Sequence, residues 1–148
     1  MRRNKLALYI HLVWATWDRQ PLIAAELERR WHRNIESQAR ELGCVVLGLN
    51  GTEDHVHLLV SLPTTISIAE LVKQVKGVSS RFVNDVLRPE AYFKWQGSYG
   101  AFTVSPGDLD RLVNYSQRQK EHHRTGQLVV EWEDTFEEFE ASRATSAL

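Results

Sequence analysis

The chain contains 148 residues, of which 43% are hydrophobic, and this size and composition are typical of one globular domain with its own core. It has no run of about 18 consecutive apolar residues, so the sequence predicts no membrane-spanning helix. Cys44 is the only cysteine, which excludes an internal disulfide and fits a reducing cytoplasm. We therefore expect a cytoplasmic protein with a single domain over residues 1–148.

The net charge of −1 conceals an uneven distribution along the chain. Residues 131–140 carry six acidic and no basic side chains. When these six acids and Arg143 are taken from the 19 acidic and 18 basic residues of the whole chain, residues 1–130 keep 13 and 17, a net charge of +4. That balance permits nucleic-acid binding without arguing for it. We interpret residues 125–148 as an acidic C-terminal extension, whose charged segment is by default a solvated helix or tail.

The first half of the chain alternates between strand and helix patterns. Residues 6–16 predict a strand with two faces. Residues 24–42 have apolar side chains at helical spacing, and Gly43 follows where a helix C-cap glycine belongs. Residues 44–49 predict a second strand, and Asn50-Gly51 after it predicts a hairpin turn. The two faces of the first strand comprise Leu6, Leu8, Ile10, Leu12 and Trp14 on one side and Ala7, Tyr9, His11 and Val13 on the other.

The strand expected after that turn, residues 53–62, carries two imidazoles on one face. Its apolar face contains Val56, Leu58, Val60 and Leu62, and its other face contains His55, His57, Leu59 and Ser61. The two histidines are about 7 Å apart along the strand, which suits two ligands of one metal ion. Because the H-x-H pattern is short, two half-exposed sheet histidines without a metal are the favoured interpretation when this stretch is taken alone.

The second half begins with a helix and ends with a strand and a further helix. Ser67 and Glu70 form a capping-box pattern, and the apolar stripe after them extends to about Leu87. Gly77 within this helix indicates close packing or is simply tolerated. Residues 99–104 predict a strand. Residues 105–108 then predict a turn in which Asp108 caps the next helix.

This order of elements, β-α-β-β-α-β, predicts an α+β fold of the ferredoxin-like or RRM-like sandwich type. Such a fold has an antiparallel sheet with two helices on one face and can leave the other face open. If the helices cover Val56 and Leu58, the open face carries His55 and His57, with Tyr9 and His11 beside them. Small modules of this topology also use an open sheet face to bind single-stranded nucleic acid.

Residues 108–124 form a helix pattern that becomes polar half-way. After Val113 no aliphatic residue occurs for eleven positions, so this half must be solvated, bridge to another subunit or line a site. Tyr115 and Gln119 are four residues apart and share a face, and His122 follows one turn later. A surface helix with an amphipathic tyrosine fits this pattern equally well.

Three motifs occur in a specific order and spacing. They are Asp54-His55-Val56-His57-Leu58-Leu59-Val60, then Trp95-Gln96 with Tyr99-Gly100-Ala101-Phe102-Thr103-Val104-Ser105, then Tyr115-x3-Gln119-x-Glu121-His122-His123-Arg124. Together they resemble the single-tyrosine HUH transposases, and more narrowly the IS200-like insertion-sequence transposases. The resemblance extends from Tyr9-x-His11 to about Phe139.

The resemblance implies a specific chemistry. Members of this family cut and rejoin single-stranded DNA through a 5′-phosphotyrosine intermediate. By resemblance Tyr115, on the C-terminal helix, is the catalytic nucleophile, and His55, His57 and Gln119 bind one Mg²⁺ or Mn²⁺ ion. A metal that polarises the phosphate would compensate for a phenol whose pKa is near 10.

The resemblance also implies partners. We expect single-stranded DNA with subterminal hairpins, and a homodimer whose active sites are shared between subunits. The candidate DNA-binding residues are His11, Lys73, Lys76, Arg81 and Arg118, with Arg2, Arg3 and Lys5 as further basic candidates.

The sequence departs from the family pattern at a few positions. Glu53 stands where the family often has proline, and Ser116 and Arg118 replace the usual isoleucine and asparagine. Arg118 could approach the phosphate or could mark an altered site. Two imidazoles and an amide suit manganese or zinc better than magnesium on ligand preference alone. The alternatives are a domesticated HUH endonuclease acting on repeat hairpins, a non-catalytic single-stranded nucleic-acid binding module, and a metal-dependent hydrolase that uses water.

Overall fold

The computed structural model describes residues 4–87 and 92–114 of the chain. The elements are β1 (Tyr9–Ala15), η1 (Trp17–Arg19), α1 (Ala25–Glu41), β2 (Val45–Gly51), β3 (His55–Ser61), α2 (Ile68–Phe82), η2 (Val83–Leu87) and β4 (Gly100–Val104). Residues 106–114 are also helical. The four strands form one antiparallel sheet in the order β2-β3-β1-β4. This is the predicted α+β sandwich, so the predicted fold class is confirmed.

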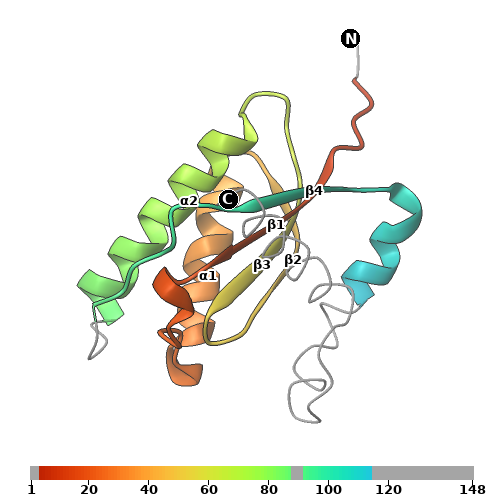
Figure 1. The fold of residues 1–148 in the computed structure, drawn as a ribbon. Helices are drawn as coiled ribbons and strands as arrows, with labels where there is room; N and C mark the ends of the chain where they lie inside the picture. Colours follow the sequence, from red (N-terminus) through yellow and green to blue (C-terminus); the bar gives the residue numbers. More distant parts are fainter. Residues whose placement is uncertain (1–3, 88–91, 115–148) are drawn as a thin grey trace, which may run out of the picture.

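Among the described residues, a layer of two helices covers one side of the sheet and helix 106–114 lies on the other side. Figure 1 shows α1 and α2 side by side against one face, while helix 106–114 lies beyond the opposite face. Both helices have apolar residues at helical spacing, so each buries one stripe against the sheet. The start of α2 and the end of α1 match the sequence prediction, whereas α2 ends at Phe82 and a π-helical turn continues to Leu87. The Oγ of Ser67 accepts the backbone N–H of Glu70 at 3.1 Å, and Gly43 adopts a φ of 93° after α1.

The core between the sheet and the two helices is continuous and rich in aromatic residues. Trp95 packs edge-on against Trp14 at a ring-centroid distance of 5.7 Å, and its indole N–H donates to the Ser79 hydroxyl at 2.9 Å. Trp31 from α1 and Phe93 complete this aromatic cluster. The remaining buried side chains include Ile10, Leu12, Ile35, Ala39, Val56, Leu58, Val60, Leu71, Val72 and Val75.

The strand register decides which side chains share the opposite face. Directly opposite residues in an antiparallel pair point to the same side of the sheet. His57 lies opposite Asn50 of β2 and Val13 of β1. His11 lies opposite Leu59 of β3 and Phe102 of β4. We call the side of the sheet that bears His11, Asn50, His55 and His57 the histidine face.

The predicted turn at Asn50-Gly51 and the predicted start of the first strand are wrong. Asn50 and Gly51 are the last residues of β2, and the turn follows them, where the Thr52 N–H donates to the His55 carbonyl at 3.0 Å. Gly51 is needed for a different reason, because a Cβ there would lie 2.6 Å from the His55 carbonyl oxygen. The first strand begins at Tyr9, where its pairing with β3 and β4 begins. Leu6 and Leu8, which were expected on its apolar face, are therefore exposed.

The expected helix cap by Asp108 is also corrected, and the structure decides between the two interpretations of Gly77. The last described helix begins at residue 106, and the Ser105 hydroxyl, not Asp108, accepts the N–H of Asp108 at 3.2 Å. Pro106 occupies the first helical position, where its missing N–H costs nothing. A Cβ on Gly77 would meet no atom within 4 Å, so this glycine is not required for close packing. Within the described ranges, no helix is long and apolar enough to cross a membrane.

Candidate metal centre on the histidine face

Three histidines from two adjacent strands meet on the histidine face. His11, His55 and His57 are 3%, 3% and 1% exposed, so the interpretation of His55 and His57 as half-exposed sheet histidines is wrong. Helix 106–114 places Leu109, Leu112 and Val113 around Leu59 on this side. Val13, Ala15 and Phe102 form a second apolar group beside the histidines. The face is therefore a small polar cluster enclosed by apolar neighbours.

His55 is oriented by polar groups of the β2–β3 turn. Its Nδ1 lies 2.7 Å from Asp54 Oδ1 and 2.8 Å from Thr52 Oγ1. Thr52 also donates to the same carboxylate oxygen, and Arg19 pairs with Asp54 Oδ2 at 3.1 Å. A carboxylate on Nδ1 favours the tautomer with the proton on that nitrogen. Nε2 is then the nitrogen of His55 that can bind a metal.

His57 is oriented by a second histidine and not by a carboxylate. Its Nδ1 lies 2.9 Å from Nε2 of His11, and the two ring centroids are 5.0 Å apart. Nδ1 is therefore directed at His11, and Nε2 is the nitrogen of His57 that can bind a metal. The rings of His55 and His57 are themselves 5.0 Å apart. Because a metal–imidazole bond is about 2.1 Å long, two rings at this spacing can reach one ion.

Burial disfavours the charged forms of His11 and His57. Desolvation lowers the pKa of His11 from its ordinary value to about 4. Desolvation, together with the neighbouring His11 and His55, lowers the pKa of His57 well below its ordinary value. Burial alone would raise the pKa of Asp54, but hydrogen bonds from His55, Arg19 and Thr52 outweigh it and hold that pKa below its usual value. A neutral imidazole is the form that binds metal, and burial favours that form for His11 and His57.

The donor set fits a divalent ion that takes two imidazoles and further ligands. In residues 4–87 and 92–114, no group of three His, Cys, Asp or Glu side chains is placed to hold a metal. His55 and His57 alone would be an incomplete site, so another ligand must come from elsewhere. Gln119, the predicted third ligand, and Tyr115, the predicted nucleophile, lie outside the described residues.

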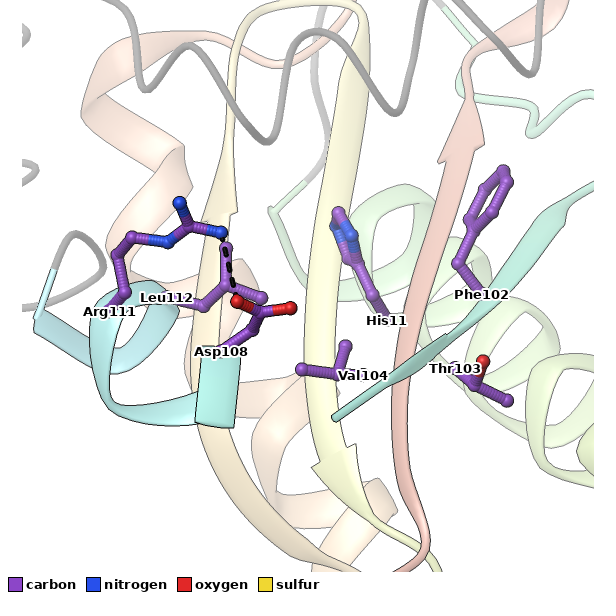
Figure 2. Close-up of a pocket in the computed structure, with 7 residues that line it drawn as sticks. All are labelled: His11, Phe102, Thr103, Val104, Asp108, Arg111 and Leu112. Atoms are coloured by element: carbon purple, nitrogen blue, oxygen red, sulfur yellow. Dashed lines mark hydrogen bonds and ion pairs between the residues drawn. The ribbon is translucent and has the colours of Figure 1, made fainter. Parts of the chain in front are cut away.

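A small pocket of about 160 Å³ opens beside His11. Figure 2 shows His11 between Phe102 of β4 and an ion pair on helix 106–114. That pair joins Arg111 Nη2 to Asp108 Oδ1 at 3.2 Å. The pocket therefore offers an aromatic ring, a guanidinium and a carboxylate at the edge of the histidine cluster.

Lys73, Lys76 and Arg81, the described lysine and arginine candidates on α2, lie away from this cluster. Lys73 and Arg81 are exposed on α2 and line a hollow of about 460 Å³ in the helix layer, on the far side of the sheet. The Lys76 ammonium donates to the backbone carbonyls of Gln96 and Ser98, and burial lowers its pKa to about 8. Lys5 is exposed, whereas Arg2, Arg3 and Arg118 lie outside the described residues.

Several neighbours of the histidines were not assigned a role from the sequence. Asp54 and Thr52 hold His55, and Asn50 lies buried opposite His57, with its Nδ2 lacking a hydrogen-bond partner in the described part of the chain. The polar Thr52-Glu53-Asp54 stretch before the H-x-H pattern was the available signal for the first two. Asn50 and Arg111 depend on strand register and helix placement, which the sequence did not provide.

Comparison with known proteins gives consistent matches. A family model described as "Transposase IS200 like" matches residues 4–119. The ISDra2 transposase TnpA of Deinococcus radiodurans is 30% identical over 122 residues, which cover 77% of this chain and 86% of that protein.

Two solved structures share the fold. A crystal structure of a Deinococcus radiodurans R1 protein assigned as a transposase has a TM-score of 0.62 at 24% identity, covering 86% of this chain and 98% of that one. A REP-associated tyrosine transposase bound to a REP hairpin has a TM-score of 0.59 at 11% identity, covering 86% and 75%.

Proposed function

Because the chain belongs to the IS200-like transposase family, we propose that it cuts and rejoins single-stranded DNA at insertion-sequence ends through a 5′-phosphotyrosine intermediate. The observation that carries this proposal is the buried pair His55 and His57, whose Nδ1 atoms are both taken by neighbours. Each ring is held through its Nδ1, which leaves Nε2 as the nitrogen that could bind an ion. The two rings are suited to hold a metal.

The proposed chemistry assigns a role to each residue. His55, His57 and Gln119 hold one Mg²⁺ or Mn²⁺ ion, which when bound polarises the scissile phosphate. The Tyr115 hydroxyl attacks the phosphorus atom and loses its proton to solvent, while the bond to the 3′ oxygen breaks and that leaving oxygen takes up a proton from solvent. The products are a 5′-phosphotyrosine link and a free 3′-hydroxyl. Because the phosphotyrosine link conserves the energy of the phosphodiester bond that was cut, a 3′-hydroxyl can attack it and reseal the strand without a nucleotide cofactor.

The last described helix supports the proposed position of the nucleophile. Leu109, Leu112 and Val113 anchor helix 106–114 on the histidine face, around Leu59. Tyr115 is the next residue but one after Val113 in the sequence. The proposed homodimer, in which each site combines the histidines of one subunit with the tyrosine helix of the other, rests on the family alone, because helix 106–114 packs on the histidine face of its own chain.

The pocket beside His11 supports a path for the DNA strand. Phe102 offers a ring on which an unstacked base can stack, and Arg111 offers a cation for a phosphate. We place the hairpins of the substrate elsewhere, with Lys73 and Arg81 on α2 as their candidate contacts.

A covalent-trapping assay tests the proposal. The protein is incubated with Mn²⁺ or Mg²⁺ and single-stranded DNA from the regions that flank its gene, and the products are separated on denaturing gels. We expect a protein–DNA adduct for the wild type and none for Tyr115→Phe or His57→Ala. A matched Tyr99→Phe variant, which also removes one phenol hydroxyl, should keep the adduct.

The other outcomes separate the alternatives. Tight binding without an adduct would indicate a single-stranded DNA binding module. Cleavage that survives Tyr115→Phe would indicate a hydrolase that uses water. An adduct formed only with repeat hairpins, and not with the flanking sequences, would indicate a domesticated endonuclease.

A further inference from the structure

We propose that His11 is a positioning residue that holds His57 in the tautomer with its proton on Nδ1, so that the Nε2 lone pair is available before the metal arrives. This inference rests on the proposed metal site and adds a residue that the H-x-H motif does not contain. It also gives His11 a different role from the DNA contact expected from the sequence.

The contact between the two rings is close and shielded from water. His11 Nε2 and His57 Nδ1 are 2.9 Å apart, and their planes are inclined at 31°. The residues occupy neighbouring strands in a diagonal relation, because His57 lies opposite Val13 and His11 lies two residues before Val13. Both side chains are at least 97% buried, so solvent does not compete for the bond.

The hydrogen bond between these two nitrogens contains one proton. Which of the two nitrogens carries that proton decides whether His57 can bind a metal. If His11 donates from Nε2, the neutral His57 must carry its own proton on Nε2, and that nitrogen cannot bind a metal. If His57 donates from Nδ1, its Nε2 bears a lone pair and can bind a metal. Only the second arrangement makes His57 a ligand, and it requires His11 to be protonated on Nδ1.

The two metal histidines thus reach the same tautomer by different means. Asp54 fixes His55 with a carboxylate, which can only accept a proton donated by Nδ1. His57 has a neutral partner that can either donate or accept. Its tautomer therefore depends on His11 remaining an acceptor at Nε2.

Two variants of His11 separate acceptor chemistry from packing. His11→Gln keeps an acceptor close to the position of Nε2, whereas His11→Phe keeps a ring of similar size and has no acceptor. Ile10→Val is the matched control, because it alters the neighbouring residue on β1 that faces the helix-side core. Thermal unfolding of each variant shows whether it folds.

The first measurement uses the metal-free full-length protein. Long-range ¹H–¹⁵N spectra of the imidazoles report which nitrogen carries the proton. We expect His57 to be protonated on Nδ1 in the wild type, in His11→Gln and in Ile10→Val, and to shift toward Nε2 in His11→Phe. A wild-type spectrum with the proton of His57 on Nε2 would overturn the inference, and this spectrum decides alone if His11→Phe does not fold.

The second measurement is Mn²⁺ binding, followed by electron paramagnetic resonance. Loss of a group that orients a metal ligand typically weakens metal binding 10–100-fold, and we expect a loss of about that size for His11→Phe. His11→Gln and Ile10→Val should bind nearly as well as the wild type. Equal affinity in a folded His11→Phe protein would overturn the inference. If the wild type binds no Mn²⁺, the proposed function loses its metal site, while the spectrum of the metal-free protein still decides the role of His11.

Discussion

The two faces of the sheet are both buried, but they are buried for different reasons. The helix-covered face joins Leu12, Trp14 and Leu58 to the apolar stripes of α1 and α2. The histidine face encloses His11, His55, His57 and Asn50 among apolar side chains. Apolar burial stabilises the fold, whereas burial of polar rings costs free energy that hydrogen bonds only offset. Burial alone therefore does not distinguish core from site, and the chemistry of the buried atoms does.

β3 contributes to both faces with consecutive residues. Val56, Leu58 and Val60 point into the helix-side core, and His55 and His57 point the other way. The apolar face fixes the register because a slip by one residue would exchange the two sets. The strand thereby holds the imidazoles with the rigidity of the core behind them.

The largest expected effects come from mutating one residue on each face of β3. Leu58→Ala removes a fully buried side chain from the core, and we expect it to lower the free energy of unfolding by about 2–5 kcal/mol. His57→Ala should instead abolish metal-dependent DNA cleavage. Chemical denaturation and the trapping assay, both applied to both variants, measure the two effects.

The contrast between the two faces requires that Leu58→Ala affects stability and not DNA cleavage. At a temperature where Leu58→Ala remains folded, its adduct yield should match the wild type. A cleavage defect in folded Leu58→Ala as large as that of His57→Ala would mean that the two faces are not independent.

The next effect concerns the charged partner of His55. Asp54→Asn keeps the size of the side chain but replaces the carboxylate that orients His55. We expect Mn²⁺ binding to weaken about 10–100-fold, as is typical for loss of such a partner. Glu53→Gln, an exposed neighbour, is the control and should bind normally. Normal Mn²⁺ binding by Asp54→Asn, measured by titration calorimetry, would show that Thr52 suffices to orient His55.

The sequence predicted the fold better than it predicted the environment of the site. Period-two and helical patterns gave the element order and both faces of β3, because local apolar spacing reflects the core directly. It missed the burial of the histidines and the contact between His11 and His57. Those depend on the register between β1 and β3 and on the placement of helix 106–114, which are tertiary facts. The Asn50-Gly51 turn was wrong because Gly51 is required by a close backbone approach instead.

The histidine face should also make stability depend on pH. The pKa of His11 is about 4 in the folded protein and about 6.5 in an unfolded chain, so the unfolded state binds a proton first as the pH falls. The stabilisation is complete above about 6.5 and is lost progressively as the pH falls toward 4, by at most about 1.4 kcal/mol per pH unit for this residue. Urea denaturation in EDTA above and below about pH 6 measures the slope. His11→Gln should give a shallower slope, and an unchanged slope would show that His11 does not titrate in this way.

The helix layer offers a smaller test, because its lysines differ in their surroundings. Lys76 donates to two backbone carbonyls, so Lys76→Met should lower the free energy of unfolding by about 1–3 kcal/mol as the carbonyls lose their donor. Lys73 is exposed, so Lys73→Gln should leave stability unchanged and weaken binding to a DNA hairpin. If Lys73 contacts a phosphate, its loss should reduce the slope of log affinity against log salt by about 0.9. If both variants had the same stability and the same DNA affinity, the structural role of Lys76 and the DNA-binding role of Lys73 would both be contradicted.

The smallest expected effect is a gain at Gly77, on the same outer surface of α2. No atom lies within 4 Å of where its Cβ would be, so Gly77→Ala should raise the free energy of unfolding by about 0.5–1 kcal/mol through reduced chain entropy. Gly77 also lines the hollow between Lys73 and Arg81, where a DNA backbone would need close approach. Denaturation and hairpin-binding measurements on this one variant therefore answer separate questions. Greater stability with unchanged hairpin affinity would mean that DNA does not approach Gly77 closely, whereas greater stability with weaker affinity would place the hairpin on α2 and keep the histidine face for the strand that is cut.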